Sequence, residues 1–248
     1  MERIFIMKYA VELYTLRDDI KTGEGLLAIF PKIKALGYDG VEFAGFYGLD
    51  AETIRKGLDD AGLVCVGTHT SLASFLPDKI DETIEFHKTL GTTDIGIGGA
   101  PHSTDADAEK IDLIFAWANK YGKEKGVRFY YHTHYSEFTA LESGRLPIDV
   151  IKNGAYLQID TYWSHYAGIN TREFLLQNSE KLVTLHIKDG VGGGPRALGE
   201  GDNDLKTVVK TAEELGFEWL IVENDNPTPN GLADIERSMK YLRDNSLV

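Results

Sequence analysis

The chain has 248 residues, of which 42% are hydrophobic, and this length fits one α/β barrel of about 250 residues, although two small domains would also fit. The formal net charge of -13 argues against nucleic acid as a partner, because phosphate contacts need many Lys and Arg side chains. The sequence has no run of about 18 apolar residues, so we expect no membrane span.

The start of the chain and the single cysteine indicate a cytoplasmic protein. Met7 is a second candidate start, so we interpret residues 1–6 as a short leader without structural weight. Cys65 excludes an internal disulfide and lies in an apolar run, which is typical of a buried, inert thiol. A lone thiol of this kind is usual in a reducing compartment, although a cysteine-poor secreted protein would look similar.

Apolar periodicity predicts eight successive units, each a strand followed by a helix. The predicted strands cover residues 9–14, 39–43, 63–69, 94–98, 127–134, 156–160, 182–188 and 219–223. The predicted helices cover residues 26–36, 50–62, 78–91, 105–126, 146–153, 171–178, 205–215 and 233–242.

Strict alternation of strand and helix predicts a parallel sheet. Eight units without a linker predict that the sheet closes into a (β/α)8 TIM barrel, a single α/β domain over residues 1–248. An open doubly wound sheet is the alternative, and it should carry a Gly-rich phosphate-binding turn after an early strand. No such turn follows the first predicted strand, so the barrel is favoured.

The last four predicted strands each end in a side chain that can bind a metal. These side chains are His132, Asp160, His186 and Glu223. Any one of them alone is more often a cap or a loop hydrogen bond, but four in succession are harder to dismiss. The C-terminal ends of barrel strands meet at one mouth. Imidazole and carboxylate together suit Mn, Fe, Co or Zn, and Mg less well, so we predict a shared divalent-metal site.

Two residues at these strand ends are candidates for catalysis. Glu223 could act as a base on a carbon next to a carbonyl group, which requires a raised pKa or tight positioning. Lys188 follows His186 by two residues and should face the same way, so it could stabilise an enediolate. A lysine on the rim of the barrel is the equally simple alternative for Lys188.

Further residues near the strand ends are candidates for binding the substrate. They are Arg196, Glu42, His69, His134 and Trp163. Arg196 follows a glycine-rich loop and could fold over a substrate as part of a lid, or lie on the surface. The ring of Trp163 suits stacking on a sugar, although most such aromatics belong to the core. His134 lies further toward the rim than His132, so we rank it lower as a ligand.

These motifs make the chain resemble the sugar phosphate isomerase/epimerase family of the xylose isomerase-like TIM barrels. The resemblance covers nearly the whole chain, and its most specific segments are Tyr131–His134, Ile159–Trp163, Leu185–Asp189, Leu198–Gly201 and Val222–Glu223. It implies a metal held by Glu, Asp, His and Glu from the last four strands, with the two Glu residues as paired acid and base. It also implies that Arg196 contacts the substrate.

His132 departs from the family pattern, because it stands where the first glutamate is expected. This replacement disfavours C3 epimerisation by two glutamates, whereas isomerisation or a lyase step needs only one base beside the metal. The resemblance therefore implies a metal-dependent isomerase or epimerase of a sugar, working through an enediolate. A lyase or dehydratase acting on a keto-sugar or keto-inositol is the alternative.

Two other readings carry less weight. An endonuclease would need a basic groove, which the net charge of -13 disfavours. A non-catalytic sugar-binding barrel would be favoured by an empty metal site. Barrels of this kind often pair through their loop faces, so a homo-oligomer stays open.

Overall fold

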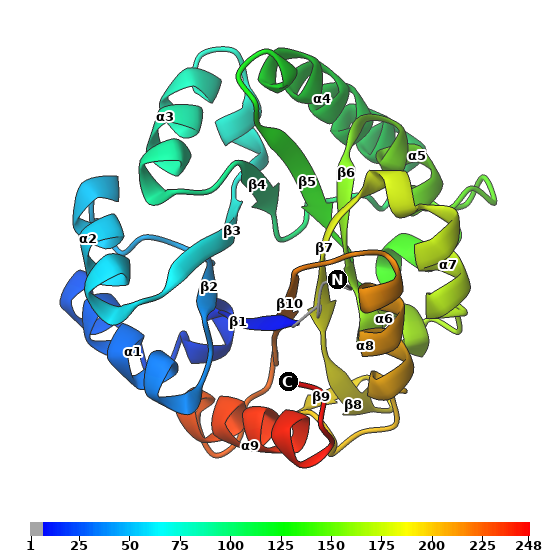
Figure 1. Cartoon of the computed structure of the whole chain (residues 1–248). Coiled ribbons are helices and arrows are strands. Elements are labelled where there is room, and N and C mark those ends of the chain that lie inside the picture. The colour runs from blue at the N-terminus through cyan, green and yellow to red at the C-terminus, as the bar shows by residue number, and fades with distance from the viewer. Residues whose placement is uncertain (1–6) are drawn as a thin grey trace, which may run out of the picture.

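The computed structural model describes residues 7–248, and the proposed leader over residues 1–6 lies outside the described residues. Eight parallel strands close into a barrel in the order β1-β10-β7-β6-β5-β4-β3-β2, with helices around it (Figure 1). The strands are β1 (Lys8–Glu12), β2 (Gly40–Phe43), β3 (Val64–Thr70), β4 (Asp94–Ile97), β5 (Arg128–His132), β6 (Tyr156–Asp160), β7 (Leu182–Ile187) and β10 (Trp219–Val222). The predicted TIM barrel is confirmed.

The helices lie outside the strands, and all except α6 begin and end close to their predicted positions. They are α1 (Gly23–Leu36), α2 (Ala51–Ala61), α3 (Ile80–Leu90), α4 (Asp105–Lys123), α5 (Pro147–Gly154), α6 (Thr161–Tyr166), α7 (Thr171–Gln177), α8 (Leu205–Glu214) and α9 (Gly231–Asp244). Within the described residues, no helix is long and apolar enough to cross a membrane.

Capping residues in the sequence explain these helix boundaries. The Asp50 side chain accepts a hydrogen bond of 2.7 Å from the Thr53 amide at the start of α2. Gly37 ends α1 with a φ of 102°, a left-handed conformation that glycine adopts without steric cost. Caps of this kind set the residue at which a helix begins or ends, and so the start of the loop that leads to the next strand.

The structure differs from the sequence prediction at two places near the mouth of the barrel. Strand β5 ends at His132 rather than His134, because the buried carboxylate of Glu137 accepts the His134 amide at 2.8 Å and turns the chain. The predicted glycine-rich loop contains an antiparallel hairpin of β8 (Asp189–Val191) and β9 (Gly194–Arg196).

Helix α6 directly after β6 is the element that the sequence prediction missed. Its aromatic-rich sequence reads as strand-like, but the Asp160 carboxylate accepts hydrogen bonds from the Tyr162 and Trp163 amides at 3.0 and 2.9 Å. This N-cap satisfies two of the amides that the first turn of a helix leaves free. One side chain therefore ends β6 and begins α6.

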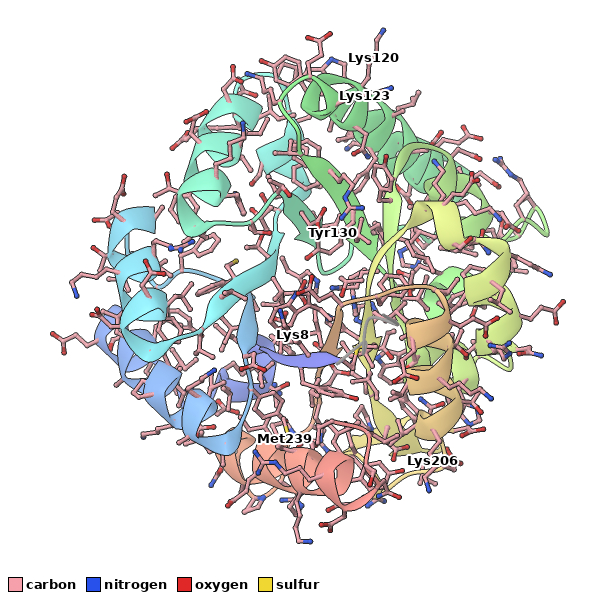
Figure 2. The ribbon with its side chains drawn as sticks, viewed as in Figure 1. Lys8, Lys120, Lys123, Tyr130, Lys206 and Met239 are labelled. Atoms are coloured by element: carbon pink, nitrogen blue, oxygen red, sulfur yellow. The ribbon has the colours of Figure 1, made fainter. Side chains whose placement is uncertain are left out.

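Side chains alternate between the inside and the outside of the barrel. On β5, Phe129 and Tyr131 pack outward in a core cluster with Phe115 of α4, whereas Tyr130 lies inside the ring of strands. Figure 2 labels Tyr130 within that ring and Lys120 and Lys123 on the outer surface. The outer layer is therefore apolar, and the inner face of the strands is free to carry polar groups.

Two glycines make room for the Tyr130 side chain. A Cβ atom at position 96 would overlap the Tyr130 ring, and a Cβ atom at position 67 would lie 2.7 Å from its hydroxyl oxygen. Tyr130 thereby crosses the barrel and donates to Glu42 on β2. The small residues on β3 and β4 are what allow a tyrosine on β5 to reach β2.

Cys65 on β3 is buried, as predicted. Its thiol donates to the Gly67 carbonyl oxygen at 3.5 Å, and burial raises the pKa of the thiol. A thiol that stays protonated is a poor nucleophile, so the inert role is supported.

We predict that Gly96→Ala lowers the free energy of unfolding by about 1–3 kcal/mol, because the new methyl group overpacks the Tyr130 ring. Urea denaturation measures this change. Gly25→Ala in α1 is the control, because its Cβ atom would meet nothing closer than 3.5 Å and alanine favours a helix. Equal stability of Gly96→Ala and Gly25→Ala would contradict the packing argument.

Candidate active site

A cavity of about 360 Å³ opens at the C-terminal ends of the barrel strands. It is lined by Tyr14, Ala44, His69, Gly98, His132, His134, Glu223 and Asp225. These residues come from chain segments at the ends of β1, β2, β3, β4, β5 and β10. The C-terminal mouth is where TIM-barrel enzymes place their catalytic groups.

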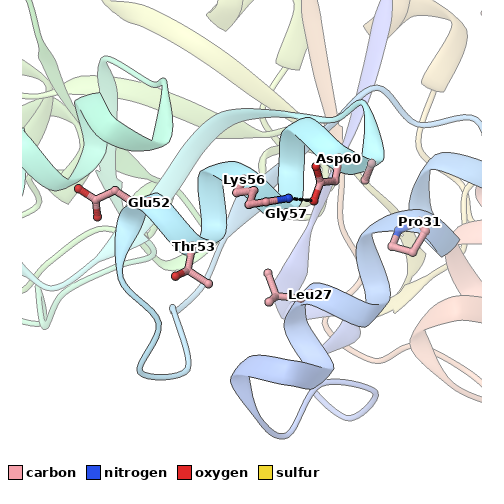
Figure 3. Close-up of a pocket in the computed structure, with 8 residues that line it drawn as sticks. Leu27, Pro31, Glu52, Thr53, Lys56, Gly57 and Asp60 are labelled. Atoms are coloured by element: carbon pink, nitrogen blue, oxygen red, sulfur yellow. Dashed lines mark hydrogen bonds and ion pairs between the residues drawn. The ribbon is translucent and has the colours of Figure 1, made fainter.

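A larger groove of about 640 Å³ lies between α1 and α2 (Figure 3), away from these strand ends. Its walls carry Leu27 and Pro31 from α1 and, from α2, Lys56, which forms an ion pair with Asp60. The charged side chains of that ion pair are largely exposed, and none of the candidate metal-binding groups lies there. We therefore place the chemistry in the smaller cavity, whose polar groups are buried and mutually close.

The barrel brings together the four residues that the sequence predicts as metal ligands. His132, Asp160, His186 and Glu223, named here the ligand cluster, each offer an atom, and these atoms all lie within 4.8 Å of one another. All four residues are buried. That the ligand cluster binds a metal stays a prediction.

Burial keeps His132 in the neutral form that a metal ligand needs. Burial, and then the positive charge of His186, hold the pKa of His132 well below its usual range. Its Nδ1 atom is hydrogen-bonded to Gln158, while its Nε2 atom lies 4.0 Å from the Glu223 carboxylate. The donor set of two imidazoles and two carboxylates therefore fits a divalent transition metal.

His186 lies between two carboxylates. Its Nδ1 atom is 2.8 Å from Glu223 Oε2, and its Nε2 atom is 2.5 Å from Glu42 Oε2. Burial opposes a charge on the ring, but Glu223 and Glu42 outweigh it and raise the pKa of His186 to about 10. The ring is therefore an imidazolium at neutral pH in the metal-free protein.

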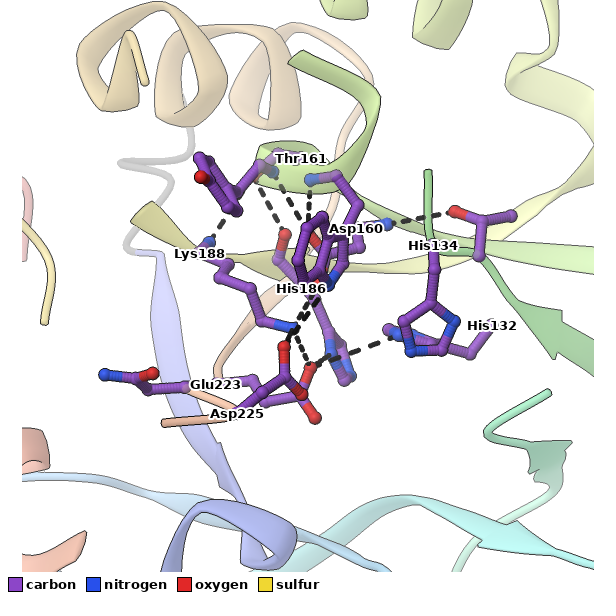
Figure 4. Close-up of polar contacts among 12 residues, drawn as sticks. His132, His134, Asp160, Thr161, His186, Lys188, Glu223 and Asp225 are labelled. Atoms are coloured by element: carbon purple, nitrogen blue, oxygen red, sulfur yellow. Dashed lines mark hydrogen bonds and ion pairs between the residues drawn. The ribbon is translucent and has the colours of Figure 1, made fainter. Parts of the chain in front are cut away.

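Lys188 lies among three carboxylates (Figure 4). Its ammonium group is 2.7 Å from Asp160 Oδ2, 2.7 Å from Glu223 Oε2 and 2.8 Å from Asp225 Oδ2. Burial alone would favour a neutral amine, but Asp160 and Glu223 outweigh it and hold the pKa of Lys188 well above its usual range. The lysine therefore keeps its charge inside the barrel.

That Lys188 stabilises an enediolate stays a prediction. Its side chain is fully buried, and it is absent from the residues that line the cavity. Two of its three carboxylate partners, Glu223 and Asp225, do line the cavity. In the metal-free protein, Lys188 neutralises the acidic groups that surround it.

That Glu42 contacts the substrate also stays a prediction. It is fully buried, and its carboxylate accepts from the Tyr130 hydroxyl, from Gln158 Nε2 at 2.8 Å and from His186. Burial would raise its pKa, but His69 and His186 outweigh this effect and lower it. Glu42 is an ionised acceptor that orients His186, in the manner of the carboxylates that support metal-binding histidines.

Glu12 at the end of β1 is a buried carboxyl group beside Glu42. Burial, and then the charge of Glu42, hold the pKa of Glu12 well above its usual range. Among the described residues its Oε2 atom has no hydrogen-bond partner, while Oε1 accepts from the Tyr14 amide at 3.2 Å. Burial and the charge of Glu42 therefore both favour the protonated form of Glu12.

His69 and His134 are the predicted substrate contacts that the structure places on the cavity wall. Trp163 is largely buried, and its indole N–H donates to Asp225 at 3.2 Å, so it positions that carboxylate and is not among the lining residues. Arg196 is exposed on β9, where its backbone lies in register with Asp189, and its side chain forms no hydrogen bond or ion pair with another described residue. Its contact with a substrate stays a prediction.

Sequence reasoning missed Gln158, Tyr130 and Asp225. Gln158 precedes Asp160 by two residues on β6, and Asp225 follows Glu223 by two residues. The signal for Gln158 was a polar side chain on the same face of the strand as a proposed ligand, within an otherwise apolar run. Tyr130 carried no comparable signal, because tyrosine is common in strands.

The chain matches the family described as xylose isomerase-like TIM barrel over residues 30–245. The chain belongs to the xylose isomerase-like TIM barrel family. This match confirms the family resemblance drawn from the strand-end motifs. An inosose dehydratase of Clostridium botulinum (strain Alaska E43 / Type E3), a curated relative, is 24% identical over 260 residues, covering 86% of this chain and 87% of that protein.

Solved structures support the same fold. A sugar phosphate isomerase/epimerase of Parabacteroides distasonis ATCC 8503 has a TM-score of 0.82 at 21% identity, covering 98% of this chain and 99% of that one. An L-ribulose 3-epimerase has a TM-score of 0.75 at 14% identity, covering 98% of this chain and 96% of that one. At these identities the likeness shows the fold alone.

We predict that Lys188→Met lowers the free energy of unfolding of the metal-free protein by about 3–5 kcal/mol, because it leaves three carboxylates near one another without their cation. Chemical denaturation of chelator-treated protein measures this change. Lys206→Met, at an exposed position on α8, should change stability by less than about 0.5 kcal/mol. A Lys188→Met variant as stable as the wild type would contradict the claim that the Lys188 charge stabilises the three carboxylates around it.

We predict that the metal-free protein loses stability as the pH rises from about 6.5 to about 10. His186 has a pKa of 6.5 in the unfolded chain and about 10 in the folded one, so its contribution is complete below 6.5 and is lost above 10. Between these values the loss approaches about 1.4 kcal/mol per pH unit.

Denaturation at several pH values tests this slope. The slope should be smaller in His186→Gln and unchanged in His165→Gln, whose imidazole is exposed. The same slope in the wild type and in His186→Gln would show that the imidazolium is not held between Glu42 and Glu223.

Proposed function

We propose that the chain is a divalent-metal-dependent isomerase or epimerase that acts on a sugar or sugar derivative through an enediolate at the mouth of the barrel. The observation that carries this proposal is the ligand cluster itself, in which two imidazoles and two carboxylates adjoin one cavity. The family match over residues 30–245 supports it, because solved structures of the same fold include sugar isomerases and epimerases by name.

The ligand cluster would hold the metal, with His132 offering its Nε2 atom. When bound, a divalent cation would polarise a substrate carbonyl group and so increase the acidity of the adjacent C–H bond. Glu42 would keep the His186 ring oriented through its bond to Nε2. The remaining chemistry is the transfer of a proton between neighbouring carbon atoms.

Glu223 is the proposed base for this proton transfer. Its carboxylate lines the cavity, and burial would raise its pKa, but Lys188 and His186 outweigh burial and hold the pKa well below its usual range. A carboxylate of low pKa is a weak base. Its effectiveness in proton transfer therefore has to come from the tight positioning that Lys188 and His186 impose. The raised pKa that the sequence argument allowed for Glu223 is absent in the metal-free protein.

His69 is a second proton-transfer group on the cavity wall. Burial lowers its pKa, so the ring is neutral at pH 7 and keeps one lone pair. The cavity therefore offers one carboxylate and one neutral imidazole. One base suffices for aldose–ketose isomerisation, and two groups allow a proton to be removed and returned on different faces of a carbon.

The charges around the cavity favour an uncharged sugar over a phosphorylated one. The lining residues include two carboxylates, from Glu223 and Asp225, and neither Lys nor Arg. The positive charge of the Lys188 ammonium group is already neutralised by three carboxylates, so it is not available to pair with a phosphate. In the metal-free protein, these carboxylates would therefore repel a phosphate dianion.

Dehydration of a keto-sugar or keto-inositol is the alternative function. The curated relative that is 24% identical over 86% of this chain is an inosose dehydratase, and this identity extends across the barrel. Both reactions begin with the same removal of a proton next to a carbonyl group. They differ in the product, since a dehydratase releases water and leaves a double bond.

We expect elemental analysis of the purified protein to find about one equivalent of Mn, Fe, Co or Zn. The double variant His186→Ala, Glu223→Ala should lose it, and the exposed-site control His165→Gln should retain it. No metal after incubation with a panel of divalent ions would reject the proposed function in favour of a sugar-binding barrel.

With the metal identified, a panel of ketoses, aldoses and keto-inositols in D2O separates the two reactions. Isomerisation or epimerisation should place deuterium on carbon without loss of water from the sugar. Dehydration should release water and give an unsaturated product. Glu223→Gln should slow either reaction by a factor of at least about 10². A reaction that proceeds at the wild-type rate in Glu223→Gln would remove this residue from the mechanism.

A further inference from the structure

The amide of Gln158 joins three residues inside the barrel mouth. Its Oε1 atom lies 2.8 Å from His69 Nε2 and 2.9 Å from His132 Nδ1, and its Nε2 atom donates to Glu42 Oε1 at 2.8 Å. Gln158 is fully buried on β6. Three strands other than its own, β2, β3 and β5, meet at this one side chain.

The orientation of the amide follows from the chemistry of Glu42. An ionised carboxylate can only accept hydrogen bonds, so the NH2 end of Gln158 must face Glu42. The carbonyl end therefore faces both histidines. An amide oxygen also only accepts, so His69 must carry its proton on Nε2 and His132 must carry its proton on Nδ1.

The two rings therefore present opposite nitrogen atoms without a proton. On His132 the bare atom is Nε2, which lies 4.0 Å from Glu223 Oε2 on the side of the ligand cluster. On His69 the bare atom is Nδ1, which faces Gly98, since a Cβ atom at position 98 would lie 3.1 Å from it. His69 and Gly98 both line the cavity, so that lone pair is placed to accept a hydrogen bond from a ligand there.

We infer that Gln158 is a positioning residue that fixes opposite tautomers on His132 and His69, one ring serving the metal and the other serving the substrate. The part that concerns the metal rests on the proposed function. Without the amide, the buried Nδ1–H of His132 would lack an acceptor, and the proton would be free to move to Nε2. A proton on Nε2 blocks the ligand atom.

Nitrogen-15 NMR of metal-free protein labelled at histidine tests the inference directly. We expect His132 to give the spectrum of an Nδ1–H ring and His69 that of an Nε2–H ring, with assignments from His132→Gln and His69→Gln. In Gln158→Glu, an acceptor oxygen still faces both rings, so these tautomers should be retained even if stability falls. In Gln158→Leu no acceptor remains, and the Nδ1–H form of His132 should be lost.

Titration with Co²⁺, followed by its visible absorption, gives a second measurement. Gln158→Leu should bind Co²⁺ about 10–100-fold more weakly than the wild type, which is the usual effect of losing a group that supports a metal ligand. Thr184→Val is the matched control, since Thr184 is also buried on a barrel strand and its hydroxyl has no partner among the described residues. It should bind Co²⁺ as the wild type does.

An Nε2–H ring at His132 in the wild type would overturn the inference, and so would equal Co²⁺ affinity in Gln158→Leu and Thr184→Val. If the wild type shows the expected tautomers but binds no Co²⁺, Mn²⁺ or Zn²⁺, the proton placement is upheld and the metal-dependent function is rejected. The two proposals therefore fail by different observations.

Discussion

A chain of alternating charges runs through the mouth of this barrel, and the candidate site depends on it. Glu42 contacts His186, His186 contacts Glu223, and Glu223 contacts Lys188, which in turn contacts Asp160. Moving one ion from water into a protein interior costs several kcal/mol unless it is paired and hydrogen-bonded. Here every buried anion has a buried cation beside it, so the carboxylates stay ionised without solvent.

The closed barrel is what makes this pairing feasible. Asp160 on β6 lies in register with His186 on β7, and Ile221, two residues before Glu223, lies in register with the same histidine on its other side. Adjacent strands thus bring oppositely charged groups close together at the mouth of the barrel. The cost of the polar interior is offset by the outer layer, where strand residues such as Phe129 pack against the helices.

The strand-end ligands could be predicted from the sequence, because each apolar run ends at a polar residue and a barrel collects strand ends at one mouth. The burial of Lys188 and its pairing with three carboxylates could not be predicted, because they depend on side chains from other strands. The same holds for Glu42, whose partners include Tyr130 and Gln158. Helix α6 was missed since the aromatic sequence hides the cap that Asp160 provides.

The histidines of the site show how the acceptor decides the charge of an imidazole. His186 has a carboxylate at each nitrogen, and both carboxylates favour the added proton, so its pKa rises to about 10. His132 and His69 share the oxygen of a neutral amide, which accepts a hydrogen bond but does not balance a full charge, so burial lowers the pKa of each ring. Rings whose centres lie 4.4 to 5.6 Å apart therefore hold different protonation states. The glutamine on β6 orients both rings through hydrogen bonds without placing a charge beside them.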